Sequence, residues 1–325
     1  MAKFQSFLIP AIEAYMADRK ASGKWCSMHE VQLLQFDRHC SKMCPGVRTE
    51  GLKLLSQEMV DSWCAQRDTE CNNSCITRIG VVSGFIKYLR IRGMTDVDEP
   101  VFPKKEKNNY IPHAFTIAEL ENFFRACDNL PTEPHLPVVF TRKITVPVFF
   151  RLLYSSGIRT NEARMLHVHD VNLEQGILSI KRSKGESQHF VVLHETMTEL
   201  MIRYDVKIRK IHPDRQYFFP SPKGFLRSNW VCKNFRECWF AYNTSYATAY
   251  GLRHHYATEN INQWVGKGFG FDSKLLYLSR SMGHSVLEST RYYYSLIPAM
   301  SDIVENLSGQ NFDSIVPEVD YEESR

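Results

Sequence analysis

The amino-acid sequence predicts a mainly α-helical protein with a small antiparallel β-sheet, built as two domains. Apolar residues recur at helical spacing throughout residues 1–94, whereas short β-type segments occur only between residues 170 and 193. A polar stretch rich in proline and lysine separates these two regions. The length of 325 residues is sufficient for two domains that each bury a core.

The first domain, residues 1–94, should consist of helices. The segments with helical periodicity are 7–23, 27–46, 56–67 and 72–93. Ser56 is a predicted N-cap, because its hydroxyl can accept a hydrogen bond from the first turn. Gly93 should end the last helix, since glycine readily takes the left-handed conformation that follows helices.

Basic side chains gather at the end of this domain and after it. Residues 95–113 combine charge, proline and asparagine without an apolar period, which predicts an extended linker. The cations form either a solvated surface or a set of contacts for a polyanion such as DNA. The candidate DNA-binding residues are Arg78, Lys87, Arg90, Arg92, Lys104, Lys105 and Lys107.

The second domain is predicted over residues 114–308. It should begin at a capping box formed by Thr116 and Glu119, and a buried helix should end at Gly157. Three short strands follow, and helices are expected again from about Ser228. The strands are expected within 170–176, 177–188 and 189–193, with the last two forming a hairpin around Lys184 and Gly185.

Two segments place arginines where helices begin. Gly157 can end one helix and Glu162 suits the first turn of the next, so Arg159 lies at a break between rigid elements. A guanidinium held there forms a surface ion pair or faces a phosphate. Further along, Tyr250 and Arg253 are three residues apart and should share a helix face. His254 and His255 should point elsewhere, and no metal-binding spacing surrounds them.

The stretch "MGHSVLESTRYYYSL" begins at residue 282. A helix with Ser273 as N-cap should stop at Gly283, and Ser285 with Glu288 forms a second capping box. His284 therefore lies between two predicted helices.

Three consecutive tyrosines, Tyr292, Tyr293 and Tyr294, follow in the second of these helices. They lie about 100° apart around the helix axis, so only one can enter a given pocket. Helix geometry leaves Tyr293 and Tyr294 as alternatives.

Net charge, cysteine spacing and hydropathy limit the class of protein and its compartment. The net charge of +4 and the isoelectric point of about 8.5 permit nucleic-acid binding without requiring it. The nine cysteines show no zinc pattern, and the chain shows no signal peptide or apolar run of membrane-spanning length. We therefore expect a cytoplasmic protein without a metal site and without a membrane partner.

Four ordered segments resemble the tyrosine recombinases of the phage integrase family. They are "GIRTNEARML", "SKGESQHFVVL", "LRHHYAT" and "MGHSVLESTRYY", spread in the family's order over residues 157–293. In the last box of the family, a Gly-His pair precedes the nucleophile by nine residues, and counting from His284 gives Tyr293. The resemblance thus selects Tyr293 from the two alternatives.

The resemblance implies a helical core-binding domain, a tyrosine-recombinase catalytic domain and an acidic C-terminal tail over 309–325. It implies a site-specific recombinase or integrase of a mobile element, acting in DNA integration or transposition. Such an enzyme cleaves and rejoins DNA through a 3′-phosphotyrosyl intermediate and a Holliday junction. It uses neither ATP nor a metal, and no cofactor, because the phosphotyrosyl bond conserves the energy of the cleaved bond.

The resemblance also assigns roles to residues. The implied catalytic residues are Arg159, Lys184, Tyr250, Arg253, His284 and Tyr293, with Glu162 supporting the arginines. The arginines would hold the phosphate, Lys184 would protonate the leaving oxygen, and His284 would contact the phosphate or assist Tyr293. The chain departs from the family at Tyr250, where a histidine is usual. A tyrosine hydroxyl donates a hydrogen bond well but accepts a proton poorly at neutral pH.

The implied partner is double-stranded DNA with paired recombination sites. Family members act as tetramers on DNA and exchange a C-terminal segment between protomers, so a nucleoid-associated homotetramer is expected. Two alternatives are a type IB topoisomerase, which relaxes DNA by the same chemistry, and a DNA-binding regulator with a weakened catalytic site.

Overall fold

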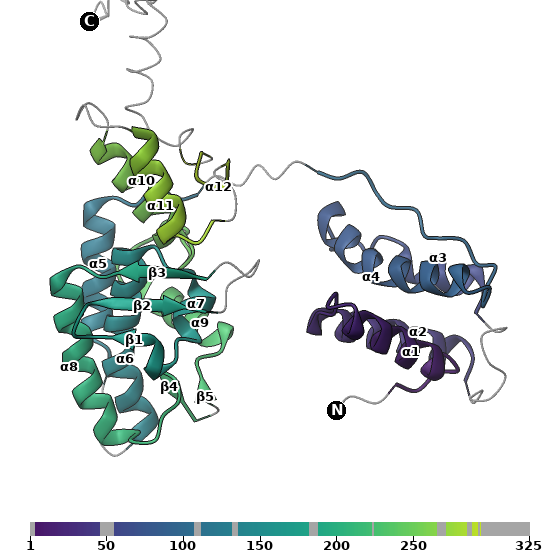
Figure 1. Cartoon of the computed structure of the whole chain (residues 1–325), viewed down its shortest axis with the longest axis horizontal. Helices are drawn as coiled ribbons and strands as arrows, with labels where there is room; N and C mark the ends of the chain where they lie inside the picture. Colours follow the sequence, from purple (N-terminus) through teal and green to yellow (C-terminus); the bar gives the residue numbers. More distant parts are fainter. Residues whose placement is uncertain are drawn as a thin grey trace, which may run out of the picture. The chain divides into compact units, whose positions relative to one another are not determined.

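The computed structural model describes residues 4–45, 55–106, 112–131, 136–181, 188–222, 224–264, 271–284, 288–291 and 293. The chain divides into two compact units, Met1–Tyr110 and Ile111–Arg325, and the division falls within the predicted linker. Figure 1 shows both units, each of which is described by itself below.

The described part of the first unit contains helices where the sequence predicted them. They are α1 (Ile9–Ala21), α2 (Ser27–Met43), α3 (Gln57–Cys64) and α4 (Asn72–Ile91). The Ser56 hydroxyl accepts a hydrogen bond from the backbone N–H of Met59 at 3.3 Å, which confirms the predicted N-cap. Gly93 follows α4 with φ of +64°, which confirms the predicted stop.

Helix α4 forms the centre of this unit, because it packs against α1, α2 and α3. Its apolar face places Val82, Phe85, Ile86 and Leu89 in the core, each fully buried. The chain after α4 stays on the unit's surface for some distance. Amide groups of Asn72 and Asn73 donate to the backbone carbonyls of Lys104 and Glu106, each at 2.9 Å.

Arg78 on α4 serves the fold of this unit, which corrects its prediction as a DNA contact. Its side chain is 4% exposed and donates to both carboxylate oxygens of Glu70, at 2.9 and 2.6 Å. It also donates to the backbone carbonyls of Trp63 and Ala65. The guanidinium is therefore engaged mainly in contacts within the fold, although Arg78 and Glu70 also line a hollow on the surface of this unit.

The second unit begins with the predicted capping box. The Glu119 backbone N–H donates to the Thr116 hydroxyl at 3.2 Å, and the Thr116 N–H donates to the Glu119 carboxylate at 2.9 Å. Helix α5 (Ile117–Asp128) follows, and then α6 (Pro137–Ser156), which ends at Gly157 with φ of +62° as predicted. The next elements are α7 (Thr160–Arg164) and the 3-10 helix η2 (Val168–Asp170).

A small antiparallel sheet follows, in the strand order β1-β2-β3. Its strands are β1 (Val171–Asn172), β2 (Ile177–Ile180) and β3 (His189–Val192). The register pairs Leu178 with Val191 and Ile180 with His189. Leu178, Ile180 and Val191 face the core, whereas Phe190 and Val192 point outward and are 67% and 72% exposed. The predicted hairpin turn at Lys184 and Gly185 lies outside the described residues.

The remaining elements include some that the sequence did not predict. Helix α8 (Glu195–Ile211) and the short hairpin of β4 (Pro220–Ser221) and β5 (Gly224–Phe225) are additional. Then come α9 (Ser228–Trp239), α10 (Gly251–Trp264), α11 (Phe271–Ser281) and α12 (Glu288–Arg291). Because α11 already begins at Phe271, the prediction of Ser273 as its N-cap is wrong. Ser285 of the predicted second capping box and the tail 309–325 lie outside the described residues.

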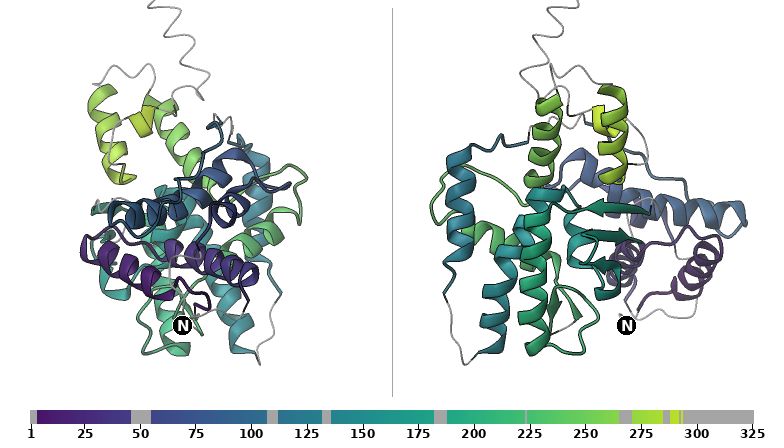
Figure 2. Two further views of the ribbon diagram at one scale, coloured as in Figure 1. Left: turned by 90° about the vertical axis from the view of Figure 1, so that its right-hand side faces the viewer. Right: turned by 60° about the vertical axis from the view of Figure 1, so that its left-hand side comes forward.

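The core of the second unit is built around α6, which packs against α5, α8 and α10. Aromatic rings dominate this core; Phe123, Phe149, Phe150, Phe219, Phe235 and Trp239 are all essentially inaccessible to solvent. Figure 2 shows α10 and α11 side by side at one end of the unit, next to β3. In the part of the chain that the structure describes, no helix combines the length and apolarity needed to cross a membrane.

Arg78→Met should destabilise the first unit by about 3 kcal/mol, because it leaves the carboxylate of Glu70 without its buried partner. Arg92→Met, at the C-cap of the same helix, is the matched control, since the ion pair of Arg92 with Asp18 is exposed and worth about 1 kcal/mol or less. Urea unfolding of the full chain measures both effects. Equal losses in the two variants would contradict the structural role of Arg78.

The pair of Arg78 and Glu70 also predicts that the stability of the first unit depends on pH. Hydrogen bonds from Arg78 lower the pKa of Glu70 to about 2. The pair therefore contributes its full stability above the unfolded pKa of about 4.3, and this contribution is lost as pH falls towards 2. The difference between wild type and Arg78→Met should shrink over that interval.

Candidate active site

Two arginines from different elements converge on the turn that ends α11. Arg253 of α10 is 2% exposed and donates from Nη1 to the Gly157 carbonyl at 2.6 Å. Its Nη2 donates to the Met282 carbonyl at 2.7 Å. Arg159 donates from Nη2 to the Gly283 carbonyl at 2.6 Å. The two guanidinium groups, distant in sequence, are thus held at one place by main-chain oxygens.

Glu162 fixes the orientation of Arg159. Arg159 occupies the N-cap position of α7, and its Nη1 donates to Glu162 Oε1 at 2.7 Å. The backbone N–H of Arg159 donates to Glu162 Oε2 at 3.0 Å. The Glu162 side chain is 2% exposed, so both carboxylate oxygens are used to hold this arginine.

His284 contacts Arg253 on one side and Thr290 on the other. Its Nε2 lies 2.9 Å from Arg253 Nη2, and its Nδ1 lies 2.7 Å from the Thr290 hydroxyl. Burial lowers the pKa of His284 to about 4, with further lowering by the charges of Arg253, Arg159 and His189. The imidazole is therefore neutral near pH 7.

Tyr293 is buried beside this histidine. It is 2% exposed and packs against Ala257, Ile261, Leu275, Leu278 and Met282 from α10 and α11. Its ring centroid lies 6.3 Å from that of His284, with 16° between the planes. Tyr292, Tyr294 and Lys184 lie outside the described residues.

Tyr250 precedes α10 rather than lying on it, which corrects the prediction that it shares a helix face with Arg253. Its backbone carbonyl accepts the Arg253 N–H at 3.1 Å, and its side chain is half exposed. The Tyr250 ring meets the ring of His254 edge-on, with centroids 4.9 Å apart.

Two histidines that the sequence analysis did not assign lie at the same place. The ring of His254 is 5.3 Å from that of Tyr293, so the prediction that His254 points away from these groups is wrong. Burial and the neighbouring Arg253 lower the pKa of His254 to about 4. On β3, His189 Nε2 lies 3.8 Å from Glu162 Oε2. Strand alternation with inward Val191 would have indicated that His189 faces inward.

The predicted DNA-contact residues of the first unit are, apart from Arg78, exposed where described. Lys87, Arg90, Arg92, Lys104 and Lys105 all present their side chains to solvent. Arg90 lies 3.3 Å from Asp98 and Arg92 lies 3.1 Å from Asp18, so two of these cations already have acidic neighbours. Lys107 lies outside the described residues.

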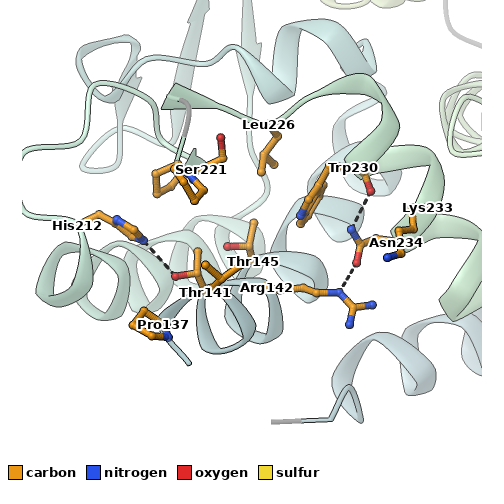
Figure 3. A pocket seen from close by; sticks show the side chains of 13 residues that line it. Pro137, Thr141, Arg142, Thr145, His212, Ser221, Leu226, Trp230, Lys233 and Asn234 are labelled. Carbon is orange, nitrogen blue, oxygen red and sulfur yellow. Dashed lines mark hydrogen bonds between the residues drawn. The ribbon is translucent and has the colours of Figure 1, made fainter. Parts of the chain in front are cut away.

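A separate cavity of about 270 Å³ lies at the beginning of α6, about 24 Å along that helix from Gly157. Figure 3 shows its lining, in which Thr141 bonds to His212 at 3.1 Å and Arg142 donates to Asn234 at 2.5 Å. None of the residues that line it belongs to the predicted site. The polar groups of Thr141, Arg142, Thr145, His212 and Asn234 are used for contacts within the fold.

The arginine cluster is suited to bind a phosphate beside a nucleophile. Two guanidinium groups supply positive charge and several N–H donors, and Tyr293 supplies a hydroxyl. The Arg253 Nε–H, although buried, has no partner among the described residues, so it remains available to a ligand oxygen. Within those residues, no group of three or more His, Cys, Asp or Glu side chains is arranged to hold a metal ion.

Comparisons with known sequences cover most of the chain. The sequence profile of the phage integrase family matches residues 115–299. The putative integrase/recombinase y4rE of Sinorhizobium fredii is 27% identical over 311 residues, which is 90% of this chain and 93% of that protein. The tyrosine recombinase XerA of Pyrococcus furiosus is 22% identical over 220 residues, which is 66% of this chain and 67% of that protein.

Two solved structures are similar in fold. The XerH site-specific recombinase in a pre-cleavage complex with its difH substrate has a TM-score of 0.57 at 20% identity, covering 82% of this chain and 75% of that chain. A lambda integrase dimer bound to a COC′ core site has a TM-score of 0.56 at 14% identity, and the match covers 88% of this chain and 76% of that chain. These likenesses confirm the predicted mainly helical fold with a small sheet.

Gly283→Ala should lose more stability than the matched variant Gly93→Ala. The two glycines have φ of +65° and +64°, so both variants carry similar backbone strain. A Cβ at residue 283 would lie 2.5 Å from His189 Cε1 and 2.9 Å from Arg159 Nη1, whereas a Cβ at residue 93 meets nothing within 4 Å. Urea unfolding compares the two variants. If both lost the same stability, the close packing of His189 on this turn would be disproved.

Proposed function

The chain belongs to the phage integrase family, whose profile matches more than half of it, and is therefore a site-specific recombinase; we propose that it breaks and rejoins DNA through Tyr293. The observation that carries this proposal is the position of Tyr293, buried beside His284 at the point where Arg159 and Arg253 converge. A phenol, two guanidinium groups and a neutral imidazole are the groups that phosphoryl transfer to tyrosine requires.

In the proposed reaction, Tyr293 Oη gives its proton to a neutral imidazole at the site, such as His254, and forms a bond to the DNA phosphorus while the bond from phosphorus to the 5′ oxygen breaks. The phosphate becomes linked to tyrosine as a 3′-phosphotyrosine, and the leaving 5′ oxygen takes a proton from Lys184. Attack by a 5′ hydroxyl on this linkage reverses the steps and joins the strands. Exchange between two duplexes in this way passes through a Holliday junction.

We propose that Arg159 and Arg253 hold the non-bridging oxygens while negative charge accumulates on them. The unused Nε–H of Arg253 supports this role, since a phosphate oxygen would satisfy a buried donor. Removing one such preorganised donor lowers the rate by about 10²–10³. Glu162 holds Arg159 through two hydrogen bonds and takes no part in bond breaking.

Tyr250 is proposed to donate a hydrogen bond to the phosphate or to the adjacent DNA backbone. Its half-exposed side chain supports contact with DNA outside the buried cluster. A role as proton acceptor is not assigned to it, because a neutral tyrosine hydroxyl is a weak base.

The first unit is proposed to bind DNA as a core-binding domain. The exposed cations Lys87, Lys104 and Lys105 suit the phosphate backbone, and the proposal extends to Arg90, Arg92 and Lys107. A hollow on the same unit is lined by Gln32, Gln35, Arg67, Asn73 and Thr77 among others. The amides of Gln32 and Gln35 suit the edge of adenine in the major groove, so these two side chains are proposed to read bases, whereas the Asn73 amide is used by the backbone of Glu106.

We propose that four copies assemble on two paired DNA sites in the cytoplasm, at the nucleoid, and exchange their C-terminal segments. In such a ring each protomer contacts the next head to tail, which couples one active site to its neighbour. The lambda integrase dimer bound to a core site supports assembly of more than one protomer on DNA for that relative. Neither the topoisomerase alternative nor the regulator alternative is favoured, because the matched relatives are integrases and recombinases.

Tyr293→Phe should bind a nicked duplex normally and form no covalent adduct with it. The duplex would carry a site that the protein has selected from random DNA, and the adduct would be detected by its slower migration in a denaturing gel. Tyr292→Phe and Tyr294→Phe are the matched controls and should still form the adduct. An adduct from Tyr293→Phe, with loss in either control, would move the nucleophile to a neighbouring tyrosine.

Lys184→Ala should slow cleavage by about 10²–10⁴, the usual contribution of a positioned general acid. A duplex with sulfur as the 5′ bridging atom should restore the rate, because sulfur leaves without a proton. Lys181→Ala is the matched control, since the Lys181 ammonium is held by Asp170 at 2.5 Å. Rescue of Lys181→Ala instead of Lys184→Ala would identify Lys181 as the acid.

A further inference from the structure

We propose that Thr290 is a positioning residue whose hydroxyl holds His284 and lets its imidazole change from hydrogen-bond acceptor to donor when phosphate binds. This inference rests on the proposed function of the site. It assigns a task to a residue that acts on the site through the imidazole of His284. His284 makes two hydrogen bonds, to Arg253 and to Thr290, and both of these partners are buried.

The first step is the tautomer of His284 in the ligand-free site. Arg253 Nη2 lies 2.9 Å from His284 Nε2, and a guanidinium has only donors. Nε2 must therefore accept, and the proton of the neutral ring is on Nδ1. From there it is donated to the Thr290 hydroxyl, whose oxygen lies at 2.7 Å.

When phosphate binds, the proton of His284 must move from Nδ1 to Nε2. Phosphate oxygens accept hydrogen bonds, so His284 can contact one only if Nε2 carries the proton. The ring then has a lone pair on Nδ1, which needs a donor. A threonine hydroxyl has one donor and two acceptor sites, so Thr290 can serve either tautomer by rotating its O–H bond. A backbone carbonyl at this place, which can only accept, would favour one tautomer only.

The third step concerns burial. Thr290 is fully buried, and among the described residues no other hydrogen-bond partner of His284 Nδ1 is present. Because the lowered pKa keeps the imidazole neutral, the position of its single proton decides whether it donates or accepts. Thr290 also lies three residues before Tyr293, so this bond ties the segment that carries the nucleophile to the turn that carries His284.

The test compares Thr290→Val with Thr290→Ser. Valine has nearly the shape of threonine without the hydroxyl, and serine keeps the hydroxyl. Adduct formation on the nicked duplex should slow by about tenfold or more in Thr290→Val, because a buried ring nitrogen loses its partner. Thr290→Ser should stay within about threefold of wild type. Duplex binding should be unchanged in both variants, and urea unfolding identifies any loss of fold.

A second measurement reads the tautomer directly and does not depend on cleavage. In protein labelled with ¹⁵N-histidine, nuclear magnetic resonance should show His284 with the proton on Nδ1 in the free chain. In Tyr293→Phe bound to the duplex, the proton should be on Nε2. In Thr290→Val the proton should stay on Nδ1 in the free chain, where Arg253 still donates to Nε2, and the change to Nε2 on the duplex should be lost.

These experiments distinguish a failure of the proposed recombinase function from a failure of the role of Thr290. Absence of any adduct from wild type on selected DNA would refute the proposed function, whatever the tautomer. With an active wild type, equal rates for Thr290→Val and wild type would overturn the role of Thr290. A proton on Nε2 in the free chain would overturn it as well, as would a Thr290→Ser variant that is as slow as Thr290→Val.

Discussion

The buried guanidinium of Arg253 is the interaction on which the arrangement of the site depends. A cation removed from water is tolerated only where its donors are bonded, and the ends of α6 and α11 supply the carbonyl oxygens. Three helices that are separate in sequence therefore meet at one side chain. Arg159 adds α7 to the same point through the Gly283 carbonyl. The position of Tyr293 follows from this frame, because its ring packs on α10 and α11.

The electrostatics of the site are simple as a result. Two arginines provide fixed positive charge, and one carboxylate, Glu162, balances part of it. Burial and these arginines lower the pKa of both His254 and His284 to about 4. The histidines therefore add directional hydrogen bonds and no charge near neutral pH. The positive charge of the site therefore comes from the arginines, and its directional hydrogen bonds come also from the neutral histidines.

The sequence was most informative where structure depends on near neighbours. The Thr116–Glu119 capping box and the left-handed stop at Gly157 follow from local chemistry, and both were predicted. The four boxes that resemble the phage integrase family identified the family that the profile match confirms. Helix α8 was missed although Met197, Met201, Tyr204 and Ile208 recur at helical spacing. The two-residue strands β4 and β5 are too short to leave a periodic signal.

The parts of the site that escaped prediction depend on contacts between distant segments. His189 on β3 lies near Glu162 on α7, and His254 on α10 lies near Tyr293, two residues beyond α12, although each pair is far apart in the sequence. Arg78 was predicted as a DNA contact because a helix surface charge looks the same in sequence whether or not a carboxylate covers it.

The arginines hold main-chain carbonyls at residues 157, 282 and 283, and this has a consequence for how such a site can evolve. A carbonyl oxygen is present whatever side chain the residue carries. Mutation can therefore alter the chemistry around the frame without removing the acceptors that anchor it. What is constrained is backbone conformation, as at Gly157 and Gly283. A lineage can in this way exchange residues such as Tyr250 while its two arginines stay in register.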